Sequence, residues 1–311
     1  MLRELIKGIR KRSRLSISKA ISLIEDGKDD SSKLLSEIFK NTGSAYKIGI
    51  TGPPGAGKSS LTHSLISSFR KDGKRVAVVA VDPTSPFSGG AVLGDRIRMT
   101  SHFSDPDVFV RSMATRGGQG GLAMKTQEVG EVFDAAGYDI IIFETVGVGQ
   151  IELDVIKATD SVLVVLVPES GDEVQMLKAG LMEIGDIFAI NKADRPGANK
   201  LMITLKNFLS THTFNQNKWT PEVVETIATE GKGVEELIRS LFKHRSFSSE
   251  RGIQKEKIND RYKGRVVKLI SDSLMDGFWK NDNTLELDTE LQKSHRERKS
   301  PYELVERLLI K

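Results

Sequence analysis

Cysteine is absent from all 311 residues of the chain. The chain therefore has no disulfide, no thiolate metal ligand and no catalytic thiol, a composition that fits a reducing compartment. Long apolar runs are also lacking, since the longest, IIIF at 140–143 and VLVVLVP at 162–168, have the length of buried strands and cannot cross a bilayer. These absences predict a soluble cytoplasmic protein without a membrane partner.

Histidine is scarce, and the five residues at 63, 102, 212, 244 and 295 show no metal-ligand spacing. The formal net charge is only +4, and much of it lies in residues 1–19. That segment could be a mitochondrial presequence or a nucleic-acid arm. Four of its apolar residues repeat at helical spacing: Leu2, Leu5, Ile6 and Ile9. We favour a surface helix with a solvated basic face and predict no nucleic-acid partner.

Three regions follow one another along the chain. Residues 1–44 predict an N-terminal arm of two helices, the second over SSKLLSEIFKN with Ser31 or Ser32 as its N-cap. Residues 246–311 predict a helical C-terminal extension, in which Ser300, Pro301 and Glu303 have the spacing of a capping box.

Between these extensions, residues 45–245 alternate short apolar runs with amphipathic helices. The runs are YKIGIT, RVAVVAVD, VFVRS, YDIIIFET, SVLVVLV, DIFAINK and EVVETIA. This alternation predicts an α/β domain with a mostly parallel central sheet flanked by helices. Because such sheets bind ligands beyond the carboxyl ends of their strands, we expect the functional residues where each run stops.

A phosphate-binding motif follows the first run. The stretch GPPGAGKS, Gly52 to Ser59, satisfies G-x-x-x-x-G-K-S between a predicted strand and a predicted helix, which is typical of a P-loop NTPase. Its glycines let backbone N–H groups curl around phosphate oxygens, Lys58 would reach the β and γ phosphates, and Ser59 would ligate Mg²⁺. The residues expected at the nucleotide are Gly52, Pro54, Gly55, Ala56, Gly57, Lys58, Ser59 and Ser60.

The stretch FAINKAD indicates the base. A carboxylate at Asp194 can accept hydrogen bonds from guanine N1–H and the exocyclic amine, whereas adenine has no such pair of donors. We expect Asn191 to contact the base edge and brace the loop, and the Lys192 stem to cover the ring. The backbone N–H of Ala228, one strand later in TIATEGKG, is a candidate donor to guanine O6.

Acidic residues occur where other strands end. Glu144 and Asp82 close two apolar runs, so we expect them to hold Mg²⁺ or its waters or to position the attacking water. Asp95 lies in a Gly- and Pro-containing loop and could serve the same purpose or form a turn. Gly147 begins a loop that can sense the γ-phosphate, and Val148 stands where other GTPases carry a water-orienting glutamine.

The chain resembles the methylmalonyl-CoA mutase-associated GTPases, the MeaB family, historically called the ArgK or LAO/AO transport kinase family. The resemblance covers nearly the whole chain. It rests on TGPPGAGKSSL, VDPTSPFSGGAVLGDRIRM, SMATRGGQGGLA, ETVGVGQIELDV, ESGDEVQMLKAGLMEIGDIFAINKAD and SPYELVERLL.

The resemblance implies a G-domain of the SIMIBI class, a C-terminal extension that forms a homodimer, and a GTPase chaperone for a B12-dependent acyl-CoA mutase. Such a chaperone gates adenosylcobalamin loading and protects the mutase. By the same resemblance, Lys58, Asp82, Asp95 and Glu144 match the nucleotide and Mg²⁺ residues, and residues 169–178 match a loop that relays nucleotide state to the partner.

Two other functions are open to a chain of this class. A nickel-insertion GTPase commonly uses Cys and His to hold its metal, and this chain has neither a cysteine nor a histidine cluster. A kinase for transport components, as the older family name suggests, would need a catalytic loop such as H-R-D-x-x-x-x-N, which the sequence lacks. We therefore rank both below the mutase chaperone.

Overall fold

The computed structural model of the protein describes residues 2–27, 30–82, 102, 104–114, 119–145, 147, 154, 156, 158–170, 181–212, 219–280 and 283–309. The chain divides into two compact units, Met1–Gln254 and Lys255–Lys311. The first unit includes the N-terminal arm, and the division falls beyond the expected boundary at residue 246. Within the described ranges, no helix is long and apolar enough to cross a membrane.

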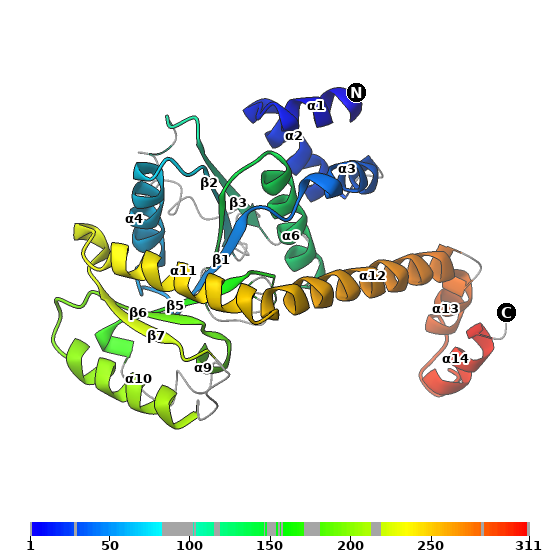
Figure 1. Ribbon diagram of the computed structural model, residues 1–311. Helices are drawn as coiled ribbons and strands as arrows, with labels where there is room; N and C mark the ends of the chain where they lie inside the picture. Colours follow the sequence, from blue (N-terminus) through cyan, green and yellow to red (C-terminus); the bar gives the residue numbers. More distant parts are fainter. Residues whose placement is uncertain are drawn as a thin grey trace. The chain divides into compact units, whose positions relative to one another are not determined.

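A seven-stranded parallel sheet forms the centre of the first unit, with the strand order β3-β2-β4-β1-β5-β6-β7 (Figure 1). The strands are β1 Tyr46–Thr51, β2 Val76–Asp82, β3 Val108–Ala114, β4 Ile140–Thr145, β5 Ser161–Leu166, β6 Ile187–Asn191 and β7 Glu222–Thr226. Each predicted apolar run coincides with or overlaps one of them, so the predicted fold class is confirmed. Since β1 lies between β4 and β5, its carboxyl end is the switch point where such sheets bind ligands.

Helices cover both faces of this sheet. In the first unit they are α1 Leu2–Arg10, α2 Arg14–Glu25, α3 Asp30–Ile38, α4 Lys58–Lys71, α6 Gln119–Ala135, α9 Leu181–Ile184, α10 Ala198–His212 and α11 Val234–Glu250. Three short 3₁₀ turns are also described: η1 Phe39–Asn41, η3 Pro168–Ser170 and η4 Ala228–Glu230.

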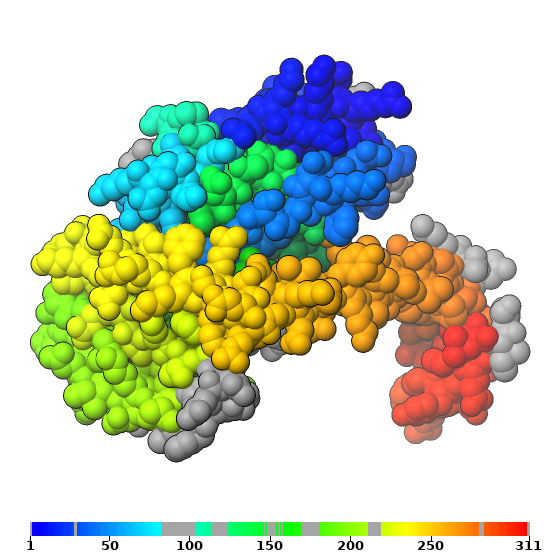
Figure 2. All heavy atoms as spheres, in the orientation of Figure 1, coloured from blue at the N-terminus to red at the C-terminus, as the bar shows by residue number. Residues whose placement is uncertain are grey.

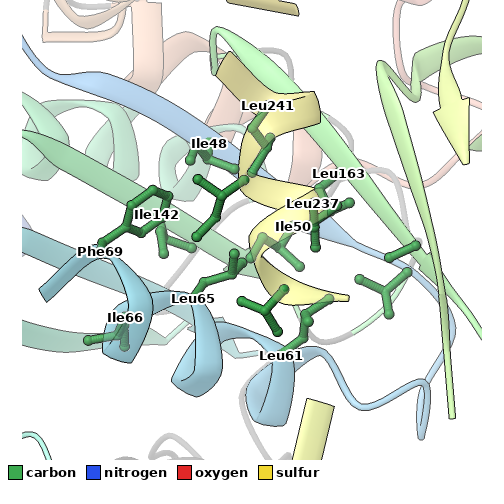
Figure 3. Close-up of a cluster of buried hydrophobic side chains, with 14 of the residues drawn as sticks. Ile48, Ile50, Leu61, Leu65, Ile66, Phe69, Ile142, Leu163, Leu237 and Leu241 are labelled. Carbon is green, nitrogen blue, oxygen red and sulfur yellow. The ribbon is translucent and has the colours of Figure 1, made fainter. Parts of the chain in front are cut away.

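One face of the sheet is covered by α4 and α11. Figure 3 shows the apolar side chains that meet there, including Leu61 and Phe69 of α4, Leu237 of α11, and Ile48 and Ile50 of β1. All five are fully buried. Because α4 follows directly from the phosphate-binding motif, this packing fixes the motif against the end of β1.

The opposite face is covered by α6 and α10, and the N-terminal arm packs outside α6. Ile9, Ile21 and Leu34 of the arm share one buried cluster with Phe133 of α6 and Phe143 of β4. In Figure 2 the arm is drawn in blue beside the green part of the unit. The arm is therefore part of the core of the first unit.

The arm departs from the prediction of two helices. It contains three, because the expected first helix breaks between Arg10 and Arg14, where Arg12 takes a left-handed conformation with φ of 60°. Ser13 then caps α2 by accepting a hydrogen bond from the Ser16 N–H at 3.4 Å. The predicted caps Ser31 and Ser32 were wrong, since both lie inside α3.

The second unit is helical, with most of α12 Ile253–Lys280, then α13 Asn283–Leu291 and α14 Pro301–Leu309. The predicted capping box of α14 is confirmed: Ser300 Oγ accepts the Glu303 N–H at 3.2 Å, and Glu303 Oε2 accepts the Ser300 N–H at 3.0 Å. Among its described apolar residues, Leu304 and Leu308 alone are buried.

Candidate functional site: a nucleotide-binding edge

The phosphate-binding motif links β1 to α4, and its glycines meet specific steric demands. Gly52 has φ of 144°, and a Cβ there would lie 2.1 Å from the carbonyl oxygen of Val165 on the neighbouring strand. Gly57 has φ of 86°, and a Cβ there would lie 2.3 Å from Nδ2 of Asn191. No other residue fits either position unless the backbone or the Asn191 side chain moves.

The start of α4 carries the lysine of the phosphate-binding motif. Gly57 is the N-cap of this helix and provides no side-chain hydrogen bond. Lys58 is buried, and its Nζ donates to the carbonyl oxygens of Gly52 at 2.8 Å and Pro53 at 3.0 Å. A cation at the start of a helix favours phosphate binding, because the helix N-terminus also favours negative charge.

Ser59 at the start of α4 and Glu144 near the end of β4 lie next to one another. Ser59 Oγ donates a hydrogen bond of 2.6 Å to Oε1 of Glu144, which is buried near the carboxyl end of β4. A hydroxyl and a carboxylate are hard oxygen donors of the kind that Mg²⁺ takes. The structure thus brings together two of the three residues predicted to hold the metal.

The third predicted metal ligand, Asp82, is the last residue of β2, in a strand paired with β4 through Val81 and Thr145. Its backbone therefore ends at the same edge of the sheet as Glu144. Asp95 and Val148 lie outside the described residues. Gly147 lies close to this edge, because its carbonyl oxygen accepts hydrogen bonds of 3.1 Å from both Thr51 and Thr145.

The base-side loop is joined to the phosphate-binding motif by Asn191, the last residue of β6. Its Nδ2 donates to the carbonyl oxygen of Ala56 at 2.9 Å, and its Oδ1 accepts from the Ala228 N–H at 3.1 Å and from Thr226 Oγ1 at 3.3 Å. The expected bracing role is visible in this geometry. The Ala228 N–H, predicted to face guanine O6, is directed at Asn191 in this structure.

Lys192 and Asp194 complete this loop. Lys192 has φ of 57°, and its Nζ donates to the carbonyl oxygen of Gly55 at 2.9 Å, so its stem crosses from the base side to the phosphate side. Asp194 is exposed and hydrogen-bonds to no other residue in the described part of the chain. A carboxylate in this condition can accept the two guanine donors without first losing a protein partner.

Three further residues support the site and were not predicted. Ser64 Oγ of α4 donates to the carbonyl oxygen of Ala228 at 2.6 Å, and Thr226 braces Asn191. Arg195, next to Asp194, pairs with Glu169 at the start of the 169–178 segment, and this hydrogen bond holds the pKa of the Glu169 carboxyl below its usual range. No sequence signal identified Ser64 or Arg195, because their partners are distant in the chain.

A parallel sheet whose switch point carries a P-loop, with an Asn-Lys-x-Asp loop hydrogen-bonded to it, defines a P-loop GTP-binding protein. Comparison with known proteins agrees. The family model "Methylmalonyl Co-A mutase-associated GTPase MeaB" matches residues 17–283. The chain belongs to the MeaB family and is a GTPase.

Individual relatives support this assignment. A Pyrococcus abyssi protein, provisionally named a GTPase, is 48% identical over 273 residues, which cover 87% of this chain and 84% of that protein. The GTPase ArgK of Escherichia coli is 34% identical over 247 residues, covering 77% and 75% of the two chains. The crystal structure of a LAO/AO transport system kinase has the same fold, with a TM-score of 0.72, 24% identity and coverage of 99% and 96%.

Proposed function

We propose that the protein is a GTP-hydrolysing chaperone that gates the loading of adenosylcobalamin onto a B12-dependent acyl-CoA mutase and protects that mutase. The family description, which names an association with methylmalonyl-CoA mutase, supports the choice of partner. The observation that carries GTP recognition is the hydrogen-bonded link from Ala56 through Asn191 to Ala228. In this proposal, the link sets the position of the base relative to the phosphates.

In this proposal, Lys58 releases the carbonyl oxygens of Gly52 and Pro53 and donates to the β and γ phosphates. Ser59 and Glu144 are the residues that would hold Mg²⁺, directly or through water, and the ion would neutralise phosphate charge. Within the described ranges no group of three or more His, Asp or Glu could hold a metal. Mg²⁺ commonly uses one or two protein ligands and takes the others from phosphates and water.

Hydrolysis is proposed to depend on the partner. Val148 cannot hydrogen-bond a water, so the usual orienting glutamine is missing from its expected place. We assign that task to Asp82 or Asp95, brought into line when the mutase engages the 169–178 segment. Positioning of this kind contributes several kcal/mol.

Single-turnover GTP hydrolysis, measured with and without the mutase, tests this assignment. The isolated protein should hydrolyse GTP slowly, and the mutase should accelerate hydrolysis. The Val148→Gln variant should have a higher basal rate of hydrolysis. Arg239→Gln, an exposed charge change on α11, is the matched control and should leave both rates unchanged. An isolated protein that turns over at about 1–10 s⁻¹, as stimulated GTPases do, would contradict the proposal.

We also propose a homodimer formed by the second unit. Helix α12 exposes apolar side chains at a regular spacing of four residues: Ile258, Tyr262, Val266, Ile270 and Leu274. Leu274 is 68% exposed. An apolar stripe of this length is typical of a helix that packs against another surface.

Light scattering on the full chain tests the dimer. The double variant Val266→Glu, Ile270→Glu should be monomeric, because it places carboxylates in the apolar stripe. Lys257→Glu and Lys268→Glu, which introduce the same charges at polar positions of α12, should remain dimeric. A wild-type protein that is monomeric at micromolar concentration would refute the dimer.

A further inference from the structure

Two arginines converge on the turn that precedes β4. Gly137 forms this turn with φ of 80°, and a Cβ built there would lie 3.5 Å from Nη1 of Arg75 and 3.7 Å from both Nε and Nη2 of Arg12. These three nitrogens are the nearest atoms to that position outside the turn itself. A small space bounded by two guanidinium groups therefore lies over Gly137.

The Arg12 guanidinium presents its forked edge to this space. Its Nε and Nη2 are equally distant from the Cβ position, and both are nearer than the Cζ atom that joins them. The open side of the fork therefore faces the space, since a stacked guanidinium would bring Cζ nearest. This edge is the one that binds the oxygens of a phosphate or carboxylate in pairs.

The second donor is Nη1 of Arg75. This atom is buried and has no hydrogen-bond partner in the described part of the chain. Asp139 accepts the Arg75 backbone N–H at 2.8 Å, and its carboxylate lies 3.8 Å from Arg75 Nε. A buried guanidinium nitrogen without an acceptor is costly, so the space over Gly137 lacks a partner oxygen.

The backbone of Arg12 adds an independent observation. Its φ of 60° costs a side-chain-bearing residue about 1 kcal/mol or more, whereas glycine adopts it freely. Its side chain is exposed and forms no hydrogen bond to another described residue. The strained turn thus holds an unpaired guanidinium beside Gly137.

We propose that the space over Gly137 is a binding site for a phosphate oxyanion, held by the Arg12 fork and Arg75 Nη1. Two guanidinium groups match a dianion better than a single carboxylate does. The nearby acids Asp105 and Asp107 are paired with Arg70, whereas Asp139 forms an ion pair with Arg75 Nε at 3.8 Å and leaves Arg75 Nη1 without an acceptor among the described residues. The site is separate from the GTP site, because Gly137 precedes β4 whereas Glu144 lies near its other end.

Calorimetric titration tests this site on the full chain saturated with Mg²⁺ and GDP, so that the P-loop is occupied. Inorganic phosphate and glycerol phosphate are titrated separately against sodium chloride of equal ionic strength. We expect one saturable site. Arg12→Gly should weaken it about tenfold or more, the effect of losing charge-assisted bonds, without lowering the unfolding temperature.

Two further variants make the result specific. Gly137→Ala leaves the charge unchanged but fills the space, so it should abolish binding. Lys74→Ala removes an exposed positive charge beside Arg75 and should bind as the wild type does.

Tighter binding of glycerol phosphate would assign the site to a phosphate ester, and equal or weaker binding would assign it to inorganic phosphate. The proposal is overturned if neither probe binds saturably, or if Arg12→Gly and Lys74→Ala weaken binding equally, which would indicate general electrostatic attraction.

Discussion

The two ends of the parallel sheet use the same residue type in opposite ways. At the amino ends, Asp139, Asp160 and Asp186 each stand immediately before a strand. Their carboxylates accept backbone N–H groups from Arg75 at 2.8 Å, Lys47 at 3.0 Å and Val162 at 2.8 Å. Each acid therefore joins the start of its own strand to the start of another.

At the carboxyl ends, two acids of the described part of the chain have different surroundings. Glu144 accepts a hydrogen bond from the side chain of Ser59, and Asp194 has no hydrogen-bond partner among the described residues. A carboxylate that accepts a backbone N–H from a neighbouring strand stabilises the fold, whereas an exposed carboxylate such as that of Asp194 can bind a ligand. The position of an acid relative to its strand thus separates a structural role from a chemical one.

The largest effect is expected at the amino end, from Asp134→Ala. The Asp134 side chain is fully buried and accepts three N–H groups, from Gly43 at 2.7 Å, Ser44 at 3.1 Å and Ala45 at 3.0 Å. Removing it leaves these donors unpaired and should lower the free energy of unfolding by about 3 kcal/mol. Denaturant unfolding measures this loss, and GTP affinity at native conditions should be unchanged. Weakened GTP binding with unaltered stability would contradict the structural role that we assign to the acids at the amino ends.

A smaller effect is expected from Asp194→Asn, and on binding alone. GTP affinity should fall by more than about 2 kcal/mol, because the amide NH₂ opposes the guanine amine, while stability changes by less than about 0.5 kcal/mol. Xanthosine triphosphate, which has a carbonyl in place of that amine, should bind better to the variant. Calorimetry measures both ligands. Asp139→Asn is the matched control, and equal GTP affinity in Asp194→Asn and the wild type would remove the guanine assignment.

The smallest effect concerns pH at the amino end. A hydrogen bond from Arg70 lowers the pKa of Asp105, so the pair stabilises the fold above the ordinary carboxyl pKa. That contribution disappears as pH falls through the lowered pKa. Arg70→Gln should therefore be less stable than the wild type by about 1 kcal/mol at pH 7, and the difference should shrink below about pH 4. Acid unfolding followed by circular dichroism measures it; a difference independent of pH would mean that packing, rather than charge, is lost.

The sequence predicted the strands well, because buried parallel strands leave continuous apolar runs such as IIIF. It also predicted which loops meet at the carboxyl edge, since parallel topology brings them there. The break at Arg12 was missed because apolar periodicity continues across it and the turn uses an arginine instead of glycine. The contact between Asn191 and Ala56 spans 135 residues and follows from tertiary packing, which no local pattern encodes.

The amino-end acids were missed for a related reason. An aspartate before a strand is compatible with a turn, a cap or a ligand, and only its partner decides among these. Asp160, for example, has a structural role because its carboxylate accepts the N–H of Lys47, which lies on a different strand. Asp82, Asp95 and Val148 remain predictions, because their side chains are outside the described part of the structure.

The burial of the N-terminal arm against α6 and β4 has a consequence for biosynthesis. The arm leaves the ribosome before α6 and β4, and Phe133 and Phe143, which cover it, follow roughly 100 residues later. At about 5–20 residues per second, its apolar faces stay uncovered for roughly 5–20 s. During that interval the nascent chain presents Ile9, Ile21 and Leu34 to whatever surrounds it, so its yield in a cell should depend on holdase chaperones and on the speed of translation through residue 143.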